Sequence, residues 1–103
     1  MRPYEGITLE NFADWVEAGW SKQDQHTLSI MALGLAGEAG EVIEPIKKQI
    51  RGDGPLDREA LKLEIGDVLH YLCRIGKYFD IDMGDVMRAN IEKLETRRAA
   101  RAK

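Results

Sequence analysis

Apolar residues recur every three or four positions along most of the chain, which is the period of an amphipathic helix. No strand-like alternation extends beyond four or five residues, and no hairpin dipeptide separates two apolar runs. We predict helices over about 9–18, 25–50, 58–79 and 83–100. The residues that we expect to cap their N-termini are Thr8, Asp24, Asp57 and Asp82. Gly19 and Gly52 follow the first and second segments and indicate where those helices end.

Each predicted helix carries an apolar stripe that we expect to face a common core. The stripes consist of Leu9, Phe12, Ala13 and Val16 in the first helix, Leu35, Ala39, Val42 and Ile46 in the second, Leu61, Ile65, Val68, Leu69, Leu72 and Ile75 in the third, and Met83, Val86, Met87, Ile91 and Leu94 in the fourth. The fold class that follows is all-α, a four-helix bundle.

The second helix contains two local conflicts with helix propensity. Pro45 lies in its interior and costs about 3 kcal/mol there, so we expect a kink or a short break near residues 42–45. Gly34, Gly37 and Gly40 follow one another at intervals of three, each costing about 1 kcal/mol relative to Ala. Either another helix packs closely against these glycines, which is the commoner reason, or they leave room for a ligand.

Length and composition favour one small domain over residues 1–103, with its core over about 25–100. A net charge of −3 argues against a stable nucleic-acid partner. Cys73 is the single cysteine, which fits a reducing compartment, and the N-terminal residues lack an apolar signal core. The longest mostly apolar run, over 28–37, is about half a membrane span, so we expect a soluble, cytoplasmic protein without a membrane partner.

Acidic residues give the strongest chemical signal. Glu38 and Glu41 lie three apart at the edge of the second helix's stripe, and Glu64 and Asp67 repeat that spacing at the same edge of the third. Antiparallel packing of the two helices would bring the four carboxylates together. Two such charges 4 Å apart cost about 4 kcal/mol at an effective dielectric of 20, so a convergent set needs protons or a cation. All-oxygen ligands favour Mg²⁺, with Mn²⁺ as a substitute, whereas the alternative is two solvated acidic faces that never meet.

A polar row lies on the fourth helix. Asn90, Lys93 and Arg97 fall within about 60° of one another around the helix axis. An amide, an ammonium and a guanidinium in one row suit phosphate oxygens, although taken alone they fit a solvated face better. Beside a carboxylate-bound metal ion, such a row indicates phosphoryl chemistry.

Three stretches of the sequence together resemble the MazG-like nucleotide pyrophosphohydrolases. They read GLAGEAGEVIEPIKKQIRG, LKLEIGDVLHYLCRIGKYFDIDM and VMRANIEKLETRR, and they occur in the family's order and spacing across about two thirds of the chain, roughly 28–98. The resemblance implies an all-α fold and Mg²⁺-dependent hydrolysis of (d)NTP to (d)NMP and pyrophosphate by attack of a metal-activated water on the α-phosphate. It also implies a homo-oligomer that completes the bundle, a tetramer rather than a dimer, with the nucleotide between neighbouring chains.

The resemblance also implies roles for individual residues. It assigns the metal to Glu38, Glu41, Glu64 and Asp67, and phosphate binding to Lys47, Lys48, Asn90, Lys93 and Arg97. A carboxylate that the metal does not fully engage would take the water proton, and we expect Glu41, with Glu38, to have this catalytic role. The sequence departs from the family pattern at Gly37, which replaces the first Glu of EExxE, and this puts a second metal ion in doubt.

Two features remain open. Trp15 and Trp20 are candidates for stacking on a nucleobase, although packing is the commoner role for tryptophan. A non-catalytic helical interaction module with solvated acidic faces is the alternative function, and such a module would have no need of the phosphate row.

Overall fold

The computed structural model describes residues 4–20 and 25–102, which form four helices and no strand. The helices are α1 (Leu9–Ala18), α2 (Gln25–Ile50), α3 (Arg58–Tyr78) and α4 (Met83–Arg101). The predicted all-α fold is therefore confirmed, with helix boundaries that differ from the expected ones by at most one residue. None of the described helices is both long enough and apolar enough to cross a membrane.

The predicted caps fix three of the helix N-termini. The Thr8 hydroxyl accepts a hydrogen bond of 3.1 Å from the backbone N–H of Asn11. The Asp57 and Asp82 carboxylates each accept one of 3.0 Å from the N–H three residues on. Each cap satisfies a backbone donor that the first helical turn leaves free. Asp24, the fourth expected cap, lies outside the described residues.

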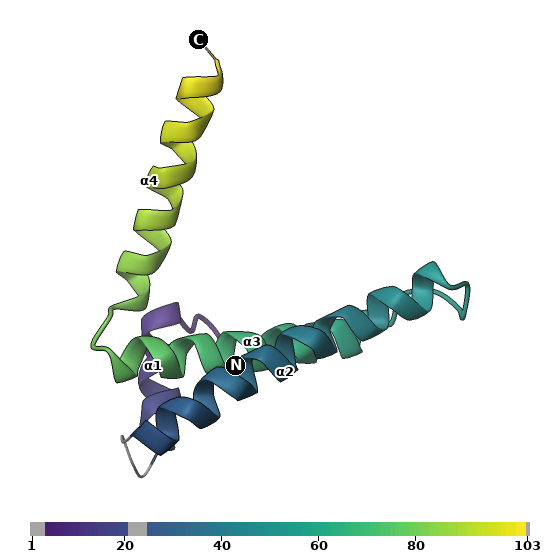
Figure 1. The fold of residues 1–103 in the computed structure, drawn as a ribbon, viewed down its shortest axis with the longest axis horizontal. Coiled ribbons are helices and arrows are strands. Elements are labelled where there is room, and N and C mark those ends of the chain that lie inside the picture. The colour runs from purple at the N-terminus through teal and green to yellow at the C-terminus, as the bar shows by residue number, and fades with distance from the viewer. Residues whose placement is uncertain (1–3, 21–24, 103) are drawn as a thin grey trace.

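The helices α2 and α3 form an antiparallel hairpin, α1 packs across α3, and α4 contacts α1 while extending away from the hairpin (Figure 1). The turn into α4 is set by Asp80, whose φ is +55°. The N–H groups of Asp80 and Ile81 donate to the carbonyls of Lys77 and Gly76, at 3.2 and 2.8 Å, which is the Schellman arrangement at a helix end.

The hydrophobic core lies where α1 crosses α3 beside the start of α4. It consists of Ala13, Val16, Cys73 and Met83, with Leu9, Phe12, Trp20 and Leu69 packed around them. The radius of gyration is 16.8 Å, whereas a compact domain of this length has about 13 Å. One chain thus forms an open structure with a small core.

The sequence-based assignment of inward-facing residues is therefore wrong in part. The α1 stripe lies in or against the core, as predicted. However, Ala39 and Ile46 of α2, Ile65 and Leu72 of α3, and Val86, Met87, Ile91 and Leu94 of α4 are exposed. The α4 residues do not join a shared core in the described ranges, because the helix contacts α1 at its start and then extends away from the hairpin (Figure 1).

Neither local conflict in α2 interrupts the helix. Pro45 is buried, and α2 runs unbroken through it, so the expected break is absent. Of the three spaced glycines only Gly34 meets another helix, because a Cβ there would lie 2.4 Å from the ring of Tyr71. Gly37 and Gly40 face open space, since a Cβ added at either position would have nothing within 4 Å.

Candidate metal and nucleotide site

Three carboxylates from the α2–α3 hairpin converge at one place on its surface. Glu38 on α2 and Glu64 and Asp67 on α3 each offer an oxygen, and these oxygens all lie within 4.8 Å of one another. The spacing of three places Glu64 and Asp67 on one side of α3, and the antiparallel partner supplies Glu38. Three of the four carboxylates that were expected to converge thus lie together, and Glu41 is not among them.

The electrostatics of this cluster favour a bound cation or a proton. The pKa of the Glu38 carboxyl is raised above its ordinary value, first by loss of solvent and then by the charges of Asp67, Glu64 and Glu41. A hydrogen bond with Asp67 raises it further. Oxygen ligands that repel one another in this way suit a hard divalent ion, which supplies the missing positive charge.

Glu41 lies beside the three convergent carboxylates, Glu38, Glu64 and Asp67, which we call the tight set, and does not belong to it. Its charge acts on Glu38, and its side chain lines an adjacent groove of about 280 Å³ with Glu44, Glu64 and Lys48. The ammonium of Lys48 borders the same groove, whereas Lys47 pairs with Glu44 at 3.4 Å.

The polar row on α4 does not reach the carboxylates within one chain. Asn90, Lys93 and Arg97 are all exposed, on a helix that contacts α1 and extends away from the hairpin (Figure 1). Within a single chain the row is therefore not brought together with the acidic cluster.

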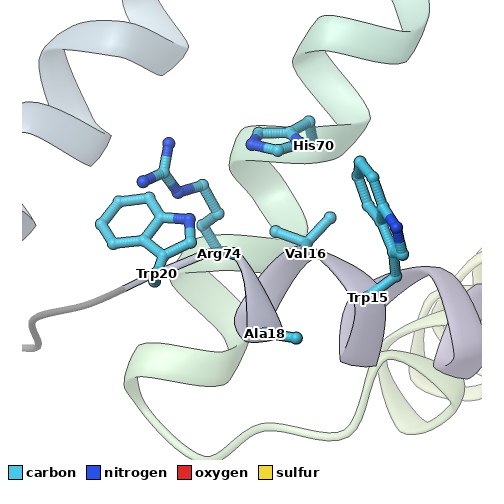
Figure 2. Close-up of a pocket in the computed structure, with 7 residues that line it drawn as sticks. Trp15, Val16, Ala18, Trp20, His70 and Arg74 are labelled. Carbon is cyan, nitrogen blue, oxygen red and sulfur yellow. The ribbon is translucent and has the colours of Figure 1, made fainter.

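A second pocket, of about 390 Å³, lies between α1 and α3 (Figure 2). Trp15 and Trp20 form opposite sides of it, and His70 and Arg74 contribute its polar groups. The pKa of His70 is lowered, first by burial and then by the neighbouring Arg74, while the charge of Asp67 opposes the shift. His70 lies three residues after Asp67 on α3, so the pocket begins about one helical turn from the acidic cluster.

Sequence reasoning did not identify Arg74 as a site residue. The available signal was its spacing, because Arg74 lies seven residues after Asp67 and therefore near the same side of α3. Its guanidinium lies over the indole of Trp20, a residue outside any helix whose position the helical pattern does not determine.

Comparison of the sequence with known proteins identifies the family of this chain. The family model of the MazG nucleotide pyrophosphohydrolase domain matches residues 25–101, which include α2, α3 and α4. Gene 37 protein of Mycobacterium phage L5 is 36% identical over 75 residues, which cover 69% of this chain and 66% of that protein, just under two thirds of its length. No solved structure gives a significant match. The chain belongs to the family of MazG nucleotide pyrophosphohydrolase domains.

Proposed function

We propose that the protein is a Mg²⁺-dependent nucleoside triphosphate pyrophosphohydrolase that converts (d)NTP to (d)NMP and pyrophosphate, with Mn²⁺ as a substitute ion. The observation that carries the proposal is the convergence of Glu38, Glu64 and Asp67, with three oxygens within 4.8 Å, in a chain of this family. The chain acts as one domain, because α1 contributes a wall to the pocket beside the cluster.

The carboxylates have divided roles in this proposal. Glu38, Glu64 and Asp67 hold the ion, and Glu41 completes the set from its place beside them. When bound, Mg²⁺ polarises phosphate oxygens and makes water more acidic. A water oxygen attacks the α-phosphorus as the bond to the bridging oxygen breaks and pyrophosphate leaves. Glu41 takes the water proton, assisted by the electrostatic field of Glu38.

Basic and aromatic groups bind the remainder of the nucleotide. Lys48, at the groove beside Glu41, and the neighbouring Lys47 contact the phosphates. Asn90, Lys93 and Arg97 contribute from a second copy, because the α4 of the same chain extends away from the hairpin. Trp15 and Trp20 flank the pocket that takes the base (Figure 2). In this proposal the active form is a homo-oligomer with each site shared between chains, and the family resemblance favours a tetramer over a dimer.

Product analysis tests this activity. The purified protein is incubated with Mg²⁺ and each of the common NTPs and dNTPs, and monophosphate and pyrophosphate are measured. In water labelled with heavy oxygen, the label is expected in the monophosphate. Release of diphosphate and inorganic phosphate would show attack at the γ-phosphate and contradict the proposal. If no nucleotide is hydrolysed, the non-catalytic interaction module becomes the better interpretation.

Substitution of the carboxylates tests the site itself. Glu41→Gln and Glu64→Gln keep the shape of the side chain and remove its charge, so we expect each to lower turnover by about 100-fold or more without unfolding the protein. Glu92→Gln, on the exposed part of α4, is the matched control and should retain wild-type turnover. Wild-type turnover in both Glu41→Gln and Glu64→Gln would show that the site is assigned to the wrong residues.

A further inference from the structure

Arg74 is a half-buried cation without an acidic partner. None of the ion pairs in the described ranges 4–20 and 25–102 includes it, and its Nε atom is buried without a hydrogen bond. Burial lowers the pKa of the guanidinium, which interaction with the Tyr71 hydroxyl offsets in part. Because no carboxylate in the described ranges pairs with this guanidinium, its terminal nitrogens can donate to a ligand that brings acceptor atoms.

The orientation of Arg74 is fixed by aromatic rings. Its guanidinium lies over the indole of Trp20 and 5.5 Å from the centroid of the Tyr71 ring. Stacking of this kind holds the planar fork of donors in one direction, which lysine cannot reproduce. In Figure 2 the guanidinium and the Trp20 ring form one side of the pocket, with Trp15 opposite and Val16 between them.

The walls of the pocket determine what kind of acceptor fits. Trp15, Val16, Ala18 and Trp20 offer indole and aliphatic surface, which suits a flat heterocycle and disfavours a hydrated phosphate group. Arg74 lies seven residues beyond Asp67 on α3, which corresponds to about 10 Å along the helix. This separation fits a nucleotide whose α-phosphate lies at the carboxylates while its base lies at Arg74.

Among the common bases, guanine best matches a fixed arginine fork. Its O6 and N7 are two acceptors on one edge, in the spacing that arginine bridges with two hydrogen bonds, whereas adenine presents a donor amino group at the corresponding position. We propose that Arg74 is the base-selecting residue of this site and that the preferred substrates are guanine nucleotides. The proposal rests on the proposed function, because it takes this pocket as the place of the base.

Steady-state kinetics with matched substrates test the selection. We expect kcat/KM for dGTP to exceed that for dATP by about tenfold or more in the wild-type protein. Arg74→Met keeps the length and apolar part of the side chain, and it should remove this preference by lowering kcat/KM for dGTP while that for dATP changes less than about threefold. Arg74→Lys keeps the charge without the planar fork, so it should lose most of the preference as well. Arg88→Met, at an exposed position of α4, is the control and should keep the wild-type preference for dGTP over dATP.

Equilibrium binding separates this proposal from the proposed activity. Quenching of tryptophan fluorescence by GMP and AMP needs no turnover, so a guanine preference that disappears in Arg74→Met supports the assignment even if no triphosphate is hydrolysed. Circular dichroism establishes whether each variant is folded. If Arg74→Met does not fold, Arg74→Lys is used for the binding comparison instead. Equal binding of GMP and AMP by the wild-type protein, tighter binding of AMP, or an equal loss for both bases in a folded Arg74 variant would overturn the proposal.

Discussion

Glu38 is the side chain on which the charges of the acidic site act most directly. Its pKa is raised above the ordinary value of 4.5 because it is desolvated and faces Asp67, Glu64 and Glu41. A carboxyl with a raised pKa binds more protons in the folded than in the unfolded protein, so the free energy of unfolding falls as pH rises. The stabilisation of the folded protein that comes from the protonated Glu38 carboxyl is fully present below about pH 4.5. It is lost as pH rises through the raised pKa of Glu38.

The fall of the free energy of unfolding with rising pH predicts a pH dependence of stability that is specific to the metal-free protein. Without divalent ions, the melting temperature of the wild-type protein should fall relative to that of Glu38→Gln as pH rises from about 4.5 to about 7. Saturating Mg²⁺ should reverse the difference, because the ion binds the folded wild-type site and offsets the repulsion. Thermal melting in EDTA and in Mg²⁺ measures both effects, with Glu92→Gln as the control. Parallel curves for the wild type and Glu38→Gln would show that the repulsion is absent.

The site residues differ in how far the sequence determines them. A spacing of three is enough to place Glu64 and Asp67 on one side of α3. Which α2 carboxylate meets them depends on the register of the hairpin, so the sequence could not separate Glu38, inside the tight set, from Glu41 beside it. Arg74 was missed because its burial depends on Trp20, which belongs to no helix.

The helices were predictable to within a residue because their ends are determined locally. Thr8, Asp57 and Asp82 bond backbone donors three residues away, and the positive φ of Gly52, +83°, ends the hydrogen bonding of α2. The effect of Pro45 did not follow the local rule, since Pro45 is buried and α2 continues through it. Tertiary context can override such a local preference.

The contact between α2 and α3 at Gly34 gives a test of this packing. Because a Cβ at Gly34 would lie 2.4 Å from the Tyr71 ring, Gly34→Ala forces the ring to move and should destabilise the protein by about 1–3 kcal/mol. Gly40→Ala is the matched control on the same helix, where a Cβ meets nothing within 4 Å, so it should stabilise by up to about 1 kcal/mol. Chemical denaturation measures both. A Gly34→Ala variant as stable as Gly40→Ala would contradict the close approach of Tyr71.

The arrangement of the four helices leaves much apolar surface uncovered. Leu33 on α2 is 75% exposed, Leu63 on α3 67% and Ile91 on α4 61%. The helical period groups the α4 residues into one stripe but could not show what covers them, since the period is the same whether the partner helix belongs to the same chain or to another. Exposed apolar faces of this extent are typical of surfaces that bind another protein.

We therefore predict that stability depends on assembly. A second copy that covers the α4 stripe would bring Lys93 and Arg97 toward a neighbouring acidic site, as opposite charges favour. The melting temperature should rise with protein concentration, because dilution shifts the equilibrium away from the associated state. Ile91→Glu places a charge in the stripe and should cause dissociation and loss of activity. Ala99→Glu adds the same charge on the face of α4 away from the polar row, about 140° around the helix from Leu94, and should change neither. Light scattering that shows a folded, active monomer at micromolar concentration would contradict the prediction and mean that one chain completes the site.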